Sequence, residues 1–128
     1  YAKSTTGPAV RAEGDATQAR DKGGFVKAMA FIDPFLPANQ SVVRCYNSQQ
    51  AGGAVSTPPC GITVTRLSQG WYKIDFGFYL QDRFLNVTVD AQGHQANAHI
   101  DSFNNNAYVT IRDGNGHSAD AKFFITVY

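Results

Sequence analysis

The sequence predicts an all-β protein, an antiparallel β-sandwich or jelly roll of about eight strands that follows a polar N-terminal arm. From residue 70 to residue 128, apolar and polar residues alternate with a period of two, which is typical of strands that bury one face. Short segments rich in Gly, Asn and Asp interrupt this alternation. No stretch has a convincing amphipathic helical pattern, which favours a sandwich over a mixed fold.

The first 24 residues differ in composition from the rest of the chain. Tyr1 and Val10 are their only large apolar side chains, among many Ala, Gly, Thr and charged residues. Such a segment buries too little apolar surface of its own to offset the entropy that ordering costs. We expect a polar arm over residues 1–24 and a β-sandwich domain over residues 25–128. The arm either runs along a neighbouring subunit or packs on its own domain through Tyr1 and Val10.

Eight segments of the β-sandwich domain are predicted to form strands, with turn signals between them. In chain order they are residues 25–32, 41–46, 62–67, 71–78, 84–90, 96–101, 108–112 and 122–128. Asp33-Pro34 ends the first strand, and Ser68-Gln69-Gly70 joins the third and fourth as a hairpin turn. Residues 91–93, 104–106 and 113–116 separate the later strands, since their Gly and Asn residues tolerate positive φ.

Alternation divides the side chains of the later strands into two sets. The inward set is apolar and is expected to form the core: Tyr72, Ile74, Phe76, Phe78, Leu85, Val87, Val89, Ala96, Ala98, Ile100, Val109, Ile111, Phe123, Ile125 and Val127. The outward set mixes polar residues with five aromatic ones: Trp71, Phe84, Tyr108, Phe124 and Tyr128. Large apolar residues that recur on one face of neighbouring strands indicate a covered surface. We expect these five residues to form a subunit interface or a ligand-binding surface.

Cys45 and Cys60 are the only cysteines, and they flank a loop rich in Ser, Gln, Gly, Thr and Pro. Neither has Cys or His partners at metal-ligand spacing, which argues against a zinc site. We expect a disulfide between Cys45 and Cys60; the alternative is two buried thiols. A disulfide implies an oxidising compartment, so the sequence predicts a secreted protein or one on the surface of a cell or virion.

Composition argues against two classes of partner. Eleven basic and ten acidic residues give a net charge of +1 without any Lys or Arg cluster, so no nucleic-acid partner is expected. The chain has no hydrophobic run long enough to span a bilayer, so we expect no membrane insertion. Tyr1 does not open a signal peptide, and we interpret the chain as a mature form.

Signals for metal binding and catalysis are weak. The spacing of His94, His99 and His117 does not require them to converge, so we expect exposed histidines and no metal or cofactor. The sequence lacks a Gly-x-Ser-x-Gly elbow, and its single Glu lies in the polar arm. We expect no enzyme and no catalytic residue.

Asp75 is the one carboxylate that an enzyme hypothesis would test first. It belongs to the outward set, as does Lys73 on the same predicted strand. The simpler interpretation is a surface residue that pairs with Arg112 or Lys122 of a neighbouring strand.

Two segments resemble a known class of domain. Gly70-Trp71-Tyr72-Lys73-Ile74-Asp75-Phe76 follows a Gly-x-Tyr-x-apolar-x-Phe pattern, and the ending Asp120–Tyr128 follows a Gly-rich hairpin. Both resemble the small β-rich terminal or head domains of bacterial surface proteins, including collagen-like ones, and of phage tail fibres. The resemblance covers the last half of the chain and implies an extracellular, often trimeric β domain without a catalytic residue. The chain lacks the Gly-x-y repeat of the collagen-tethered members.

These observations favour an extracellular structural or assembly module that self-associates into a fibre, filament or trimeric head. The expected partner is another copy of the chain. The alternative is a carbohydrate-binding adhesin domain whose partner is a surface glycan, because Trp71, Tyr108 and Asn104–Asn106 are residue types that stack on sugar rings and bind their hydroxyls. Trp71 fits a subunit interface equally well.

Overall fold

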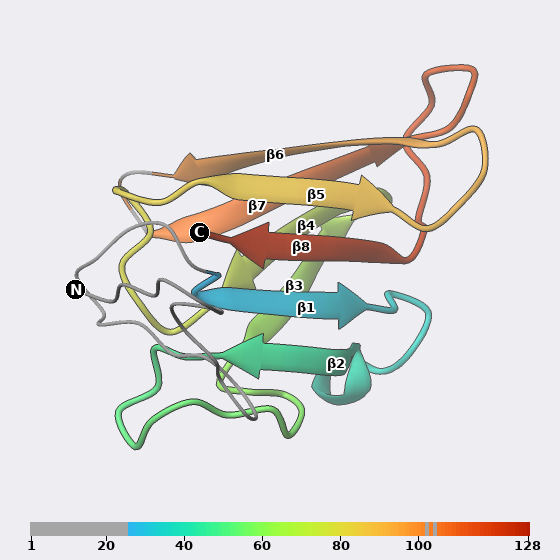
Figure 1. Cartoon of the computed structure of the whole chain (residues 1–128). Helices are drawn as coiled ribbons and strands as arrows, with labels where there is room; N and C mark the ends of the chain where they lie inside the picture. The colour runs from blue at the N-terminus through green and yellow to red at the C-terminus, as the bar shows by residue number, and fades with distance from the viewer. Residues whose placement is uncertain (1–25, 102, 104) are drawn as a thin grey trace, which may run out of the picture.

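The chain folds into a sandwich of two four-stranded antiparallel sheets in the computed structural model, which describes residues 26–101, 103 and 105–128 (Figure 1). The elements are β1 (Ala28–Ile32), the 3-10 helix η1 (Ala38–Gln40), β2 (Val42–Asn47), β3 (Thr63–Ser68), β4 (Trp71–Asp75), β5 (Leu85–Val89), β6 (Gln95–Asp101), β7 (Asn106–Arg112) and β8 (Phe123–Val127). The predicted antiparallel sandwich is confirmed. The arm predicted over residues 1–24 lies outside the described residues.

The strand order joins segments that are distant in the sequence. Sheet A has the order β2-β1-β8-β5, and sheet B has the order β3-β4-β7-β6. The chain crosses from one sheet to the other after β2, β4, β5 and β7, so β8 pairs with β1 on one side and with β5 on the other. β5 and β6 belong to different sheets but lie side by side at one edge of the sandwich (Figure 1).

The core lies between the sheets and contains the predicted inward set. The inward residues of β4, β7 and β8 are almost fully buried, and those of β5 and β6 are partly buried against them. Tyr72 of sheet B contacts Phe123 of sheet A across the core, with ring centroids 5.3 Å apart. The inward residues of β1, which were not among the predicted core residues, are also buried: Ala28, Ala30 and Ile32.

Two strand boundaries differ from the sequence prediction by three residues, and the others by two at most. β1 begins at Ala28 instead of residue 25, which lies outside the described residues. β4 ends at Asp75 instead of residue 78, because Gly77 adopts a positive φ of 76° and its N–H donates to the Asp75 carboxylate at 2.8 Å. The buried and exposed residues still alternate beyond this bend, so Phe78 reaches the core as predicted.

A disulfide between Cys45 and Cys60, with an S–S distance of 2.04 Å, confirms the predicted pair. Cys45 lies on β2, at one edge of sheet A, and Cys60 closely precedes β3, at an edge of sheet B. The bond therefore ties the two sheets together along one side of the sandwich and indicates an extracytoplasmic protein. Within the described part of the chain, no helix has the length and apolarity needed to cross a membrane.

Candidate functional site on the outer faces of the sandwich

The five outward aromatic residues lie on two opposite surfaces, so the expectation that they share one surface was wrong. Phe124 lies on the outer face of sheet A, and Trp71 and Tyr108 lie on the outer face of sheet B. Phe84 and Tyr128 exchange two backbone hydrogen bonds, of 3.3 and 2.9 Å, and extend the β5–β8 ladder by one pair. Alternate residues of a strand share a face, and so do register partners. The side chains of Phe84 and Tyr128 therefore lie on the same side of sheet A as that of Phe124.

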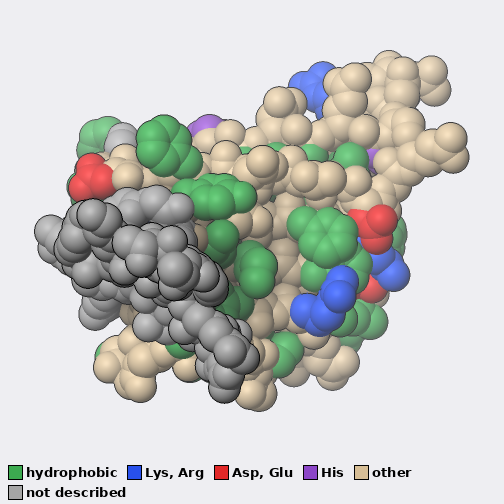
Figure 2. Space-filling model, in the orientation of Figure 1, with side chains coloured by type: hydrophobic (Ala, Val, Ile, Leu, Met, Phe, Trp, Pro, Cys, Tyr) green, Lys and Arg blue, Asp and Glu red, His purple; other side chains and the backbone are tan. Residues whose placement is uncertain are grey.

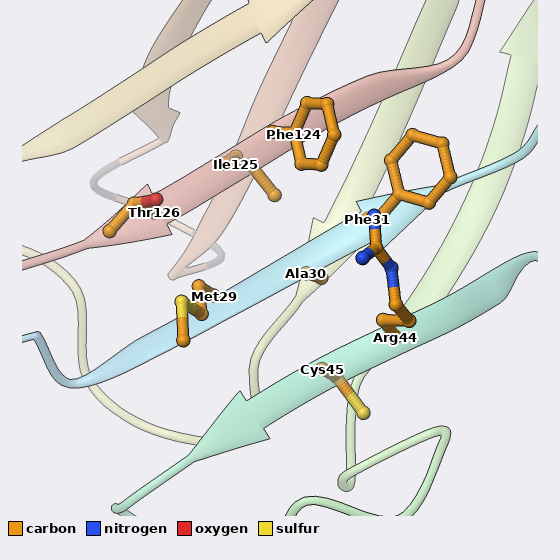
Figure 3. A pocket seen from close by; sticks show the side chains of 8 residues that line it. All are labelled: Met29, Ala30, Phe31, Arg44, Cys45, Phe124, Ile125 and Thr126. Carbon is orange, nitrogen blue, oxygen red and sulfur yellow. The ribbon is translucent and has the colours of Figure 1, made fainter.

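The centre of the sheet A surface is a pair of stacked phenylalanines. Phe31 of β1 is the register partner of Phe124 of β8, and their ring centroids are 4.5 Å apart. The guanidinium of Arg44, on β2, lies 5.1 Å from the centroid of Phe31 and 6.0 Å from that of Phe124 (Figure 3). Met29 and Thr126 continue this surface along β1 and β8. We call these five residues the apolar face.

The apolar face is open to solvent and slightly hollowed. A depression of about 310 Å³ lies among its side chains. Met29 and Phe124 are 47% and 39% exposed, and Phe84, near the end of the same face, is 78% exposed. Figure 2 shows hydrophobic side chains gathered over β8 and β1, with charged ones toward the right, where β1 ends and β8 begins. Exposure of this degree is unusual for a cluster of large apolar side chains.

Met29, Phe31 and Arg44 were not among the site residues predicted from the sequence. The signal was present, since Ala28-Met29-Ala30-Phe31 alternates small and large apolar residues. The small residues face the core and the large ones face solvent. Nothing local to this segment shows that its outward residues meet Phe124, which is 93 positions away by residue number, because that contact depends on the β1–β8 pairing.

The outer face of sheet B carries a different group of rings. The centroids of Trp71 and Tyr108 are 6.4 Å apart at an interplanar angle of 40°, and His99 stacks on Tyr108 at 5.4 Å and 14°. We call these three residues the ring cluster. They line an open depression of about 390 Å³ together with Ile100 and Asp101. Two of its members, Trp71 and Tyr108, were predicted site residues. His99 was predicted only to be exposed, as it is.

The asparagines proposed to accompany these rings have other roles. Asn104 lies outside the described residues. The Asn105 side chain donates to the carbonyl of Phe78 at 2.8 Å and accepts the N–H of Leu80 at 2.5 Å. Asn106 is buried. Asn105 thus anchors the β4–β5 connection, and neither Asn105 nor Asn106 lines the depression beside the ring cluster.

A third group of polar residues joins β3, β4 and the segment before β8. Asp120 accepts hydrogen bonds from Arg66 Nη2 at 2.7 Å, from the N–H of Gly70 at 2.9 Å and from the hydroxyl of Tyr72. The bond from Arg66 is the largest of the effects that lower the pKa of Asp120 to about 2, and burial opposes them. Burial, followed by the bond to Asp120, raises the pKa of the Tyr72 hydroxyl. The tyrosine therefore stays protonated, and the carboxylate stays ionised with its charge balanced by Arg66, which is typical of a structural group.

The other singled-out polar residues do not converge. His117 Nδ1 lies 3.7 Å from the carboxylate of Asp113, and within the described residues no three His, Cys, Asp or Glu side chains are placed to hold a metal. The predicted pairing of Asp75 with Arg112 or Lys122 was wrong. Asp75 accepts the N–H of Gly77, whereas Lys122 forms an ion pair of 3.1 Å with Asp33. Lys122 closely precedes β8, and β8 is a neighbour of β1 rather than of β4.

Comparison of the chain with family models, with curated proteins and with solved structures gave no match.

Proposed function

We propose that this protein is an extracellular structural module that self-associates into a homo-oligomer or polymer through the apolar face of sheet A. The observation that carries the proposal is the partly exposed stack of Phe31 and Phe124 beneath the guanidinium of Arg44. Aromatic residues, Met and Arg are the residue types enriched in protein interfaces, and the apolar face contains all three. Covering the apolar face would remove large apolar side chains from water, which stabilises an assembly by about 25 cal/mol for each Å² of apolar surface buried.

Two further points support the proposal. The disulfide agrees with a secreted protein or one on a cell or virion surface. The resemblance of the last half of the chain to head domains of surface proteins and tail fibres implies the same kind of self-association.

The substitution Phe124→Glu tests the proposal. Glutamate at this position removes the aromatic stack with Phe31 and places a charge that the assembly would have to desolvate, so we expect the assembly to dissociate into monomers. The fold should persist because the adjacent core residues Phe123 and Ile125 face the other way. Native mass from light scattering after size exclusion reports the assembly, and circular dichroism reports the fold.

Thr65→Glu is the matched control, because Thr65 is an exposed residue on the outer face of sheet B. This variant should keep the native mass. A wild-type chain that is monomeric at every concentration, or an assembly that Phe124→Glu leaves intact, would refute the proposal.

A further inference from the structure

The ring cluster of sheet B is separated from the apolar face by the whole thickness of the sandwich. Its rings lie on three neighbouring strands, with Trp71 on β4, Tyr108 on β7 and His99 on β6. Trp71 is 43% exposed, and the depression that the rings line is within the size range of small-molecule sites. These rings therefore offer apolar surface to a ligand at a place that self-association through sheet A leaves uncovered.

Polar side chains of three different chemistries border the rings. In the strand register, Lys73 is the partner of Tyr108, and Thr110 is the partner of both Trp71 and Asn97. Because register partners project from the same face, an ammonium, a hydroxyl and an amide surround the rings. Asp101, whose Oδ1 accepts the N–H of Phe103 at 2.9 Å, borders the depression itself. The site thus combines apolar ring surface with both donors and acceptors of hydrogen bonds.

We propose that this depression binds a saccharide. A sugar ring has the same combination of properties, since its C–H groups form an apolar face and its hydroxyls both donate and accept hydrogen bonds. Trp71 and Tyr108 would contact the C–H face, and Lys73, Asn97, Thr110 and Asp101 are placed to bind hydroxyls. The three rings follow one another across the strands, so an oligosaccharide fits the surface better than a single sugar unit.

Two other occupants fit the surface less well. Single-stranded nucleic acid also stacks on aromatic rings, but it requires basic residues along its phosphates. Here Lys73 shares the face with Asp75 and Asp101, and the net charge of the chain is only +1. A protein interface of the kind proposed for sheet A has a mainly apolar centre, whereas Thr63, Thr65, Gln95, Asn97 and Thr110 surround the ring cluster on its own face.

The chain contains a reporter for this proposal. Trp71 is its single tryptophan, so intrinsic tryptophan fluorescence observes the candidate site directly. The full chain would be titrated with four defined probes: cellotetraose, chitotetraose, mannotetraose and a galactotetraose. We expect at least one probe to change the emission saturably, with a dissociation constant on the order of 1 mM or lower.

Variants assign the binding to the ring cluster. Removal of an aromatic contact in Trp71→Ala or Tyr108→Ala should weaken the binding by about tenfold or more, measured by calorimetry, and Trp71→Phe should retain most of it. Phe124→Glu, on the opposite face, should bind the sugar with unchanged affinity even if it no longer assembles. The two proposals therefore fail independently of each other.

Three results would overturn the saccharide proposal. The first is the absence of saturable binding for all four probes, and the second is binding that survives both alanine substitutions. The third is a preference for another occupant, observed either as salt-sensitive binding of oligothymidylate in place of the sugars or as loss of the native assembly in Trp71→Ala.

Discussion

The guanidinium of Arg66, on β3, binds the carboxylate of Asp120, which lies 54 positions later and three residues before β8. The carboxylate also accepts the N–H of Gly70 in the β3–β4 turn and the hydroxyl of Tyr72. One side chain thus connects the β3–β4 hairpin of sheet B to the chain segment that enters sheet A.

Because of this connection, the stability of the protein should decrease as the pH falls into the acid range. The pKa of Asp120 is about 2 in the folded protein, below the value of about 4 expected in the unfolded chain. A depressed pKa contributes stability above the unfolded value, and this contribution is lost as the pH falls from about 4 to about 2. We expect Asp120 to account for about 1–2 kcal/mol of the decrease, after allowing for solvent screening at the exposed Arg66 side chain.

Urea denaturation of the wild type and of Asp120→Asn, from pH 2 to pH 6, measures this effect. The variant should be less stable by about 1–2 kcal/mol at pH 6, and the two curves should converge near pH 2. Parallel curves over the whole range would show that Asp120 does not carry the acid sensitivity.

The Cys45–Cys60 disulfide should stabilise the protein by restricting the unfolded chain. It closes a loop with a sequence separation of 15, and such a cross-link restricts the unfolded chain by about 3 kcal/mol. We expect the double substitution of both cysteines by Ala to lower the free energy of unfolding by roughly that amount, measured by guanidinium denaturation. Intact mass after alkylation without reductant is the accompanying control, and incorporation of two alkyl groups would contradict the bond.

Gly70 should be far less tolerant of a side chain than Gly93. Both have positive φ, of 69° and 75°. A Cβ on Gly70 would lie 2.5 Å from the carbonyl oxygen of Ile111, whereas a Cβ on Gly93 would have no neighbour within 4 Å. We expect Gly93→Ala to cost about 1 kcal/mol, from the left-handed backbone alone, and Gly70→Ala to cost clearly more, about 2–4 kcal/mol. Thermal denaturation compares the two variants, and equal melting temperatures would contradict the clash.

Asn47 should contribute strongly to the stability of the fold although it is polar. It is fully buried, and its Nδ2 donates to the carbonyls of Cys60 and Phe76 at 3.0 Å each, while its Oδ1 accepts the N–H of Gln49. Asn47→Ala would leave these groups unpaired in the interior, which we expect to destabilise the protein by about 2–4 kcal/mol.

The matched control for Asn47→Ala is Asn86→Ala, at an exposed position on β5, which should change stability by less than about 0.5 kcal/mol. The two variants would be compared by urea denaturation. An Asn47→Ala variant as stable as the Asn86→Ala control would show that the buried hydrogen bonds contribute little.

The sequence by itself determined the features that depend on neighbours in the chain. Period-two alternation identified Tyr72, Ile74 and Ile125 as core residues, because successive side chains of a strand must point to opposite faces. The turn at Ser68-Gln69-Gly70 was predictable because the backbone of Gly70 needs a conformation that glycine adopts without strain. The disulfide was predictable because the chain offers only one pair of cysteines.

Only the tertiary structure decided which outward residues share a surface. Alternation specifies whether a side chain faces inward or outward, but the strand order specifies its sheet and its neighbours. For this reason Phe124 meets Phe31 rather than Trp71, and Lys122 pairs with Asp33 rather than with Asp75. The pairing of β1 with β8 and the crossovers between sheets rest on packing between distant segments. No local pattern of residues encodes them, so the two candidate surfaces emerged only when the sheets were assembled.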